Sequence, residues 1–172
     1  MNKAALQYAH AGFISRAIAF VLDLVVMSIA VVAAIALVEA VLGFFTLYGL
    51  VGQRVVQSSP FRDAVVAVIA LIGAGIAIGY PVGSWVLLGQ TPGKLLMGLR
   101  VARINGQPLT IRRALLRYLG YWLSAIPLGL GFLWVLVDDR RQCWHDKLAG
   151  TYVVYDPRSP FARSSFNDKA LA

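Results

Sequence analysis

The chain has 172 residues, of which 59% are hydrophobic and 14% are charged. The apolar share exceeds the roughly 45–50% of soluble domains, which indicates a membrane protein. The length suits one domain, and we expect the lipid bilayer to be its main surroundings. A lone Cys143 excludes a disulfide scaffold. Although 16 basic residues stand against 8 acidic ones, the bases gather at the ends of apolar segments without interleaved aromatic residues, which argues against nucleic-acid binding.

The first apolar run covers residues 17–38, within which Asp23 is the one charged residue. About 20 apolar residues cross a bilayer core, so we expect a transmembrane helix over about residues 16–40. A cleaved signal peptide would have a shorter apolar core without an acid, so we expect this segment to be retained. Residues 39–62 mix glycines, Pro60 and aromatic residues, which predicts a connection that begins as helix and ends as an interfacial loop.

The second apolar run, residues 64–88, has no charge and predicts a second span over about residues 63–88. Gly75, Gly79 and Gly83 recur every four residues and share one helix face. Small residues in this pattern let another helix approach closely in lipid. We predict a packing role for them, either within one chain or between subunits.

Residues 89–94, Gly-Gln-Thr-Pro-Gly-Lys, end the apolar pattern. The segment fails as a phosphate-binding loop, because Leu88 and Leu95 stand where that motif needs glycine and serine or threonine. Residues 99–104 and 151–155 are strand candidates, and Asn105-Gly106 is a turn signal. We expect the two segments to pair in a small sheet at the cytoplasmic membrane surface.

A third hydrophobic segment, residues 112–138, is broken in its middle by Ile126-Pro127-Leu128-Gly129-Leu130-Gly131. As a straight span it would leave eight Lys and Arg residues on each side of the membrane. As a hairpin that enters and returns, it would place 14 on one side and 2 on the other, which satisfies the positive-inside rule. The sequence therefore predicts an all-α membrane protein with two transmembrane helices, a broken helical hairpin, a small cytoplasmic strand pairing and cytoplasmic termini.

Asp23 is the candidate for chemistry in the first span. A carboxylate about two turns inside the membrane is costly alone, so we expect it to be paired, hydrogen-bonded or protonated. Arg16 shares its helix face but lies about 10 Å along the axis, so we expect another partner. Four bases arrive from the cytoplasmic side: Lys94, Arg112, Arg113 and Arg117, of which Arg117 should lie deepest. A structural salt bridge and an ion- or proton-binding carboxylate are both open interpretations.

The densest polar run is residues 138–151. No nucleophile motif accompanies His145 and Asp146, and a metal set of His10, Cys143, His145 and Asp146 lacks a recurring ligand spacing. We therefore expect no enzyme activity, catalytic residue, metal or cofactor. Asp146 is predicted to accept hydrogen bonds from the backbone or basic groups of residues 89–100 and so to fix the C-terminal part to that loop.

Several short motifs occur in a characteristic order. They are Gly12-Phe13, Arg16 and Asp23, then residues 89–94 with Gly98-Leu99-Arg100-Val101, and finally residues 145–151. Together they resemble the RDD family of bacterial integral membrane proteins, which is named for one arginine and two aspartates. The resemblance covers residues 11–155 and implies that Arg16, Asp23 and Asp146 are those three residues. Residues 156–172 are expected to be a flexible polar tail.

The resemblance implies transport of an unidentified ligand, since transport has been proposed for the family and some members are linked to sodium/proton exchange. Two spans and a hairpin enclose no aqueous path, so transport requires a homo-oligomer or other membrane subunits. We expect a multi-pass protein of the bacterial cytoplasmic membrane with a polar network of Arg16, Asp23, Lys94, Arg117 and Asp146. The alternative is a non-catalytic membrane subunit that scaffolds or regulates a larger complex.

Overall fold

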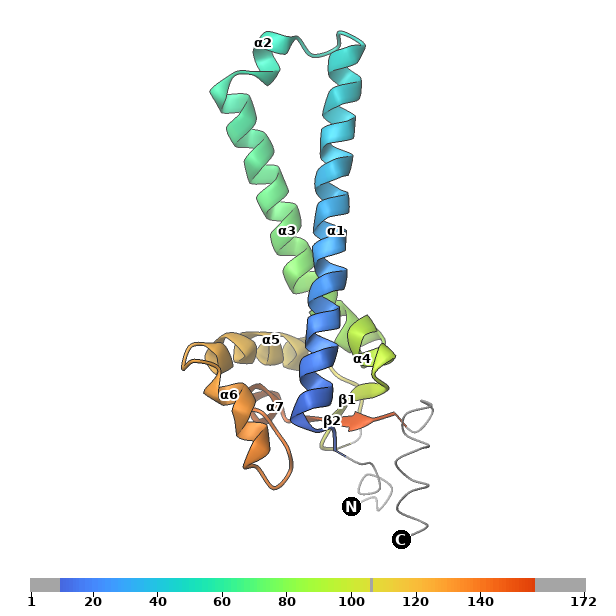
Figure 1. Ribbon diagram of the computed structural model, residues 1–172, viewed down its shortest axis with the longest axis vertical. Coiled ribbons are helices and arrows are strands. Elements are labelled where there is room, and N and C mark those ends of the chain that lie inside the picture. The colour runs from blue at the N-terminus through green and yellow to red at the C-terminus, as the bar shows by residue number, and fades with distance from the viewer. Residues whose placement is uncertain (1–9, 106, 157–172) are drawn as a thin grey trace. The chain divides into compact units, whose positions relative to one another are not determined.

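The computed structural model describes residues 10–105 and 107–156 of the chain. The elements are mainly helices, with two short strands late in the sequence (Figure 1). In chain order they are α1 (Phe13–Leu47), α2 (Gln53–Val56), α3 (Ser59–Leu87), α4 (Pro92–Leu96), β1 (Leu99–Arg103), α5 (Ile111–Ala125), α6 (Leu130–Leu133), the 3-10 helix η2 (Trp134–Leu136), α7 (Trp144–Ala149) and β2 (Thr151–Tyr155). Except for residue 156, the predicted flexible tail lies outside the described residues.

Helices α1 and α3 are each long and apolar enough to cross a membrane, which confirms the two predicted spans. Both are longer than predicted: α1 extends beyond residues 16–40 at each end, and α3 begins before residue 63 but ends at Leu87. Helix α1 continues through the exposed Glu39 and through Gly43 to Leu47, because neither an exposed acid nor one glycine is sufficient to end a long apolar helix. The predicted connection after residue 38 does begin as helix, and it contains the short helix α2.

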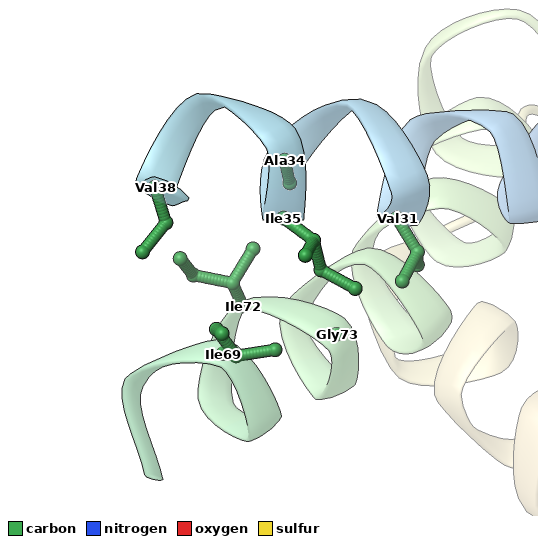
Figure 2. A pocket seen from close by; sticks show the side chains of 7 residues that line it. All are labelled: Val31, Ala34, Ile35, Val38, Ile69, Ile72 and Gly73. Carbon is green, nitrogen blue, oxygen red and sulfur yellow. The ribbon is translucent and has the colours of Figure 1, made fainter. Parts of the chain in front are cut away.

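The chain divides into two compact units. One unit holds residues 25–80, in which α1 and α3 meet along an apolar seam shown in Figure 2. The seam is lined from α1 by Val31, Ala34, Ile35 and Val38, and from α3 by Ile69, Ile72 and Gly73. Its lining is apolar throughout, so within this unit the contact between the helices depends on side-chain packing.

The predicted glycine row lies on α3. A methyl group added at Gly75, Gly79 or Gly83 would have no heavy atom within 4 Å. The described residues therefore provide no close helix contact at these positions, and the packing role stays a prediction.

The second unit holds the described residues before 25 and after 80. Within it, α5 is followed by α6 and η2 at a bend of 110°, which confirms the broken third segment. The break is formed at Leu128 and Gly129, whose φ angles of 52° and 78° lie in the left-handed region. Glycine adopts this conformation at little cost, so Gly129 permits the reversal.

Strands β1 and β2 pair antiparallel, with Leu99 opposite Tyr155 and Arg103 opposite Thr151. This confirms the predicted strand pairing across about fifty residues of sequence. Asn105 makes a local turn, since its side-chain oxygen accepts a hydrogen bond from the Gln107 amide at 3.3 Å. Gly106 itself lies outside the described residues. The buried faces of the strands, Leu99, Val101 and Val153, join Trp85 and Ala114 in the core of this unit.

Candidate functional site

Asp23 lies on the buried side of α1 and is 4% exposed. Its Oδ2 atom accepts a hydrogen bond from the Thr91 hydroxyl at 2.5 Å, and its Oδ1 atom accepts one from the Gly93 amide at 2.8 Å. The Lys94 ammonium stands 3.4 Å from Oδ2 and 3.4 Å from the Thr91 hydroxyl. The carboxylate is thus both hydrogen-bonded and ion-paired, as burial of a charge requires.

The start of α4 explains why these groups meet. Thr91 is the N-cap residue and Pro92 opens the helix, but the Thr91 hydroxyl makes no capping bond. Asp23, which belongs to α1, caps α4 in its place. Its carboxylate accepts a hydrogen bond from the Gly93 amide, one of the first amides that α4 leaves without an internal partner. Glycine is needed here, because a Cβ atom at Gly93 would lie 2.4 Å from the Ala19 carbonyl oxygen.

Of the four bases considered for Asp23, Lys94 makes the contact. Arg117, expected to lie deepest, binds Asp146 instead. Sequence reasoning missed Thr91 and Gly93 as partners. A signal was available in Thr-Pro at 91–92, which is a typical helix start, and a helix start presents amides to a carboxylate.

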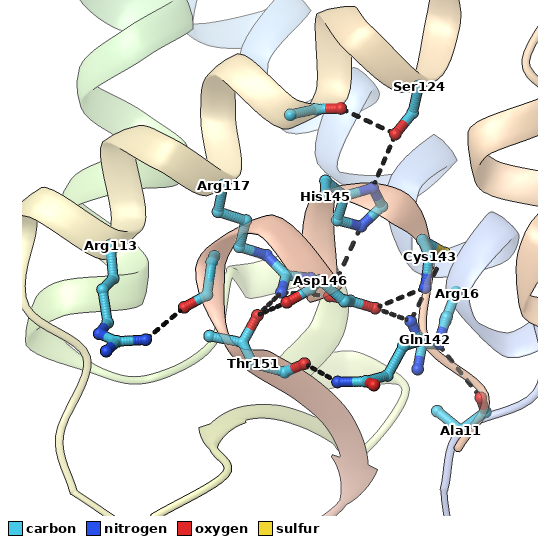
Figure 3. A network of polar contacts seen from close by, with 12 residues as sticks. Ala11, Arg16, Arg113, Arg117, Ser124, Gln142, Cys143, His145, Asp146 and Thr151 are labelled. Atoms are coloured by element: carbon cyan, nitrogen blue, oxygen red, sulfur yellow. Dashed lines mark hydrogen bonds and ion pairs between the residues drawn. The ribbon is translucent and has the colours of Figure 1, made fainter. Parts of the chain in front are cut away.

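Asp146 forms a second centre, which Figure 3 shows with its partners. Its Oδ2 atom accepts a hydrogen bond from Arg16 Nη1 at 2.5 Å, and its Oδ1 atom accepts one from Arg117 Nη1. It also accepts the Cys143 amide at 3.2 Å, which closes the N-terminal turn of its own helix α7. Asp146 is 0% exposed and Arg117 is 1% exposed, so both charges of that pair are removed from solvent.

The expectation that Asp146 binds residues 89–100 is wrong, because its partners come from α1 and α5. That loop instead lies against Asp23. Burial alone would raise the pKa of the Asp146 carboxyl, but the Arg117 guanidinium, assisted by Arg16, holds that pKa well below its usual range. The carboxylate therefore stays ionised at neutral pH.

The two arginines extend the centre to neighbouring backbone. Arg16 also donates to the Ala11 and Arg141 carbonyl oxygens, at 3.1 and 2.7 Å. Arg117 donates to the Thr151 hydroxyl at 2.6 Å, and Gln142 donates to the Thr151 carbonyl at 2.7 Å. Through these bonds, the network joins the start of α1 to α5, α7 and β2.

Trp85 of α3 lies between the two centres and is 2% exposed. Its ring has the Lys94 ammonium 5.8 Å from its centroid and the Arg117 guanidinium 5.2 Å from its centroid. Both distances are in the range of a cation–π contact. One aromatic ring therefore contacts the cation of each centre, and the five residues of the predicted polar network fall into two adjacent groups.

Ser124, His145 and Asp146 stand in the order of a hydrolase triad, yet the geometry does not suit one. The Ser124 hydroxyl is 3.5 Å from His145 Nδ1, but it donates to the Gly120 carbonyl at 2.7 Å and is 0% exposed. The His145 ring stacks on Tyr121 with centroids 4.2 Å apart. Burial lowers the pKa of His145 to about 3, helped by the arginines, so the ring is neutral at pH 7. Its role here is to fill the space between α5 and α7.

Cys143, His145 and Asp146 also bring three metal-ligating atoms within 4.8 Å of one another. His10, the fourth residue considered in that set, forms a backbone bridge with Val154 and meets the Tyr152 ring edge-on. The chemistry does not favour a cation, because a guanidinium already binds each carboxylate oxygen of Asp146. Burial also raises the pKa of the Cys143 thiol to about 11, which keeps the sulfur protonated.

Comparison with curated proteins and with solved structures finds no match for this chain. The sequence model of the RDD family does match, over residues 10–150. That region contains Arg16, Asp23 and Asp146, so the residue pattern that suggested the family lies inside the matched part. With most of its length matched and two helices able to cross a membrane, this chain belongs to the RDD family of membrane proteins.

Proposed function

We propose that the protein transports an ion or small solute as an oligomer in the bacterial cytoplasmic membrane, with Asp23 as the ion- or proton-binding carboxylate. The proposal rests on the contact between Asp23 and Lys94. Thr91 and Gly93 hold the carboxylate at ordinary hydrogen-bond distances, whereas the Lys94 ammonium stands 3.4 Å away. Charged hydrogen bonds usually measure about 2.7–2.9 Å, so Lys94 neutralises the charge without a close bond.

This arrangement suits exchange. When Asp23 takes up a proton or a cation, it no longer needs the Lys94 ammonium, and the Trp85 ring still contacts that ammonium. The Thr91 hydroxyl oxygen and a carboxylate oxygen are hard ligands of the kind that alkali cations and protons take. Buried acids within membrane proteins commonly mark ion pathways.

The excess of bases in residues 89–117 and after residue 137 supports cytoplasmic termini under the positive-inside rule. The same count supports a multi-pass topology in which the hairpin returns to the cytoplasmic side. An oligomer supplies the walls of a path that two spans alone cannot enclose.

The decisive experiment is ion flux in sealed proteoliposomes that contain the full chain, with imposed sodium, potassium or pH gradients. Asp23→Asn should reduce ion-coupled flux to background, because the amide cannot carry the exchangeable charge. Asp63→Asn is the matched control, since Asp63 is exposed on α3, and it should transport like the wild type. Equal flux from Asp23→Asn and wild type would overturn the proposal, as would background flux from the wild type under every gradient.

A second candidate is a non-catalytic subunit that scaffolds or regulates a membrane complex. The Asp146 centre favours this role, because two guanidiniums bind both oxygens of the carboxylate and leave none for a ligand. The unit that this centre holds together exposes Arg100, Arg140 and Arg141. Charge reversal at these positions, or at the half-buried Arg103, should reduce co-isolation of a partner from gently extracted membranes. Arg54→Glu is a matched control outside this unit. A native mass equal to a multiple of this chain alone would contradict the subunit role.

A further inference from the structure

Helix α5 has two faces of opposite character. Its buried face consists of Ala114, Arg117, Gly120 and Ser124. Ala114 belongs to the apolar core, Arg117 binds Asp146, Gly120 lies against His145 of α7, and Ser124 lies against Gly131 of α6. The opposite face exposes six large apolar side chains, each at least 41% accessible: Ile111, Leu115, Leu119, Trp122, Leu123 and Ile126. At 100° per residue these positions form one continuous stripe along the helix.

The position of α5 next to the start of α1 bears on what covers this apolar stripe. The first turns of α1 belong to the same unit as α5, and α1 then continues without a break as an apolar helix. A helix long and apolar enough to cross a membrane therefore begins inside this unit. Figure 1 shows α5 running crosswise to these first turns, with α7 on the side of α5 nearer the start of α1. The apolar stripe, opposite the face that packs on α7, therefore lies on the side of α5 away from the start of α1.

Charge on the stripe fits a lipid headgroup. Arg112 is exposed near the N-terminal end of the stripe, one turn from Leu115. An arginine guanidinium matches the geometry of a phosphate, and a long side chain can keep its charge in the headgroup layer while its stem lies on apolar surface. Exposed Trp122 has the same preference for the interface.

We propose that α5 is an interfacial helix that lies flat in the cytoplasmic leaflet, with its apolar stripe among the acyl chains and Arg112 on a lipid phosphate. The occupant of the stripe is the bilayer itself. This placement replaces the predicted hairpin that enters and returns: α5 follows the membrane surface, and both ends of the broken segment stay on the cytoplasmic side without a descent into the bilayer core. The proposal does not depend on whether the protein transports an ion.

The test uses nitroxide labels on single cysteines introduced at Leu115, Leu119 and Leu123 of the full chain, reconstituted in phospholipid vesicles. Native Cys143 is 4% exposed and therefore competes little for the label. Accessibility to oxygen and to a water-soluble nickel complex gives the depth of each label. Ile29→Cys, on the exposed lipid face of α1, and Asp139→Cys, in the exposed segment after η2, calibrate the lipid and water limits.

A flat helix places all three labels at one depth, with more oxygen and less nickel access than Asp139→Cys. A helix that crosses or dips would change depth by up to about 12 Å between positions 115 and 123, from a rise of about 1.5 Å per residue. Such a gradient would overturn the proposal. Water-like access at all three positions would also overturn it, as would exclusion of both reagents, which indicates a protein partner.

Arg112→Glu sharpens the test by placing a carboxylate against lipid phosphate. The label at position 115 should then move several-fold toward nickel access, while the label at 123 and an Arg54→Glu control remain as in the parent. No change at position 115 would remove Arg112 from the proposal. Elution volume and thermal midpoint establish that each labelled protein is folded.

Discussion

The two buried carboxylates of the same unit are held in different ways. Asp146 is bound on both oxygens by guanidiniums and also closes the first turn of its own helix. Asp23 is bound by a hydroxyl and an amide at short range and by an ammonium at 3.4 Å. Asp146 and its arginines thus connect four elements through short charged contacts, whereas the ammonium that pairs with Asp23 stands farther from its carboxylate.

The two centres therefore differ in what a substitution should change. Removing one partner of a tight buried ion pair leaves an uncompensated charge, which is a large penalty. Removing a partner from the Asp23 centre disturbs a helix cap and an ion pair at 3.4 Å, for which we expect a smaller loss of stability. We therefore expect substitutions at the Asp146 centre to affect stability and those at the Asp23 centre to affect the proposed ion exchange.

The largest effect is expected for Asp146→Asn. The amide leaves the buried Arg117 and the partly buried Arg16 without their counter-charge, and breaking a buried pair destabilises by about 3–5 kcal/mol. The measurement is the thermal midpoint and the folded yield in detergent. Asp138→Asn is the control, because Asp138 pairs with a Lys147 side chain that is 44% exposed. Equal midpoints for the two variants would contradict the central role of Asp146.

The next effect is a dependence of stability on pH through His145. Burial lowers the pKa of its imidazole to about 3 in the folded protein, so the unfolded chain binds a proton first as the pH falls below about 6.5. Stability should therefore decrease from pH 6.5 toward pH 3, with a limiting slope of about 1.4 kcal/mol per pH unit. Comparing thermal midpoints at pH 7.5 and 5 tests this. The loss should shrink in His145→Gln and persist in His10→Gln, and an unchanged loss in His145→Gln would assign it elsewhere.

A smaller effect is expected for Gly93→Ala. The added methyl would lie 2.4 Å from the Ala19 carbonyl oxygen and 2.7 Å from Asp23 Oδ1, so α4 must move away from α1. Overpacking of this kind destabilises by about 1–3 kcal/mol. Gly43→Ala is the matched control on α1, where an added methyl meets nothing within 4 Å. If the two variants melt together, the close approach at Gly93 is not required.

The smallest effect on stability is expected for Thr91→Val, which removes one hydrogen bond to Asp23 and keeps the shape of the side chain. The loss should be about 1.5 kcal/mol, the lower end of the range for a hydrogen bond to a charged group. If Thr91 also positions the carboxylate, ion flux should change more than the thermal midpoint does. Thr46→Val, which removes a hydroxyl bonded to the Leu42 carbonyl on α1, provides a control away from the centre. Flux equal to that of the wild type would limit Thr91 to a structural role.

The local sequence determined most of the fold. Apolar runs of membrane-spanning length specified α1 and α3, because only a helix satisfies the backbone within lipid. Pro127 and Gly129 specified the break between α5 and α6, and strand-like residues specified β1 and β2. The sequence also singled out Arg16, Asp23 and Asp146, since charged residues beside or within apolar segments are rare.

Which of these charges meet depends on how the helices pack. In both centres the paired charges come from segments far apart in the chain, so no spacing along the sequence encodes the pairing. The pairs are Asp23 with Lys94, and Asp146 with Arg16 and Arg117. Thr91 and Gly93 became partners of Asp23 because α4 packs its first turn against α1. Arg117 pairs with Asp146 because Gly120 lets α7 approach α5 closely. Composition and periodicity are local properties that a chain carries before it folds, whereas the choice among several oppositely charged partners depends on which backbones can come into contact.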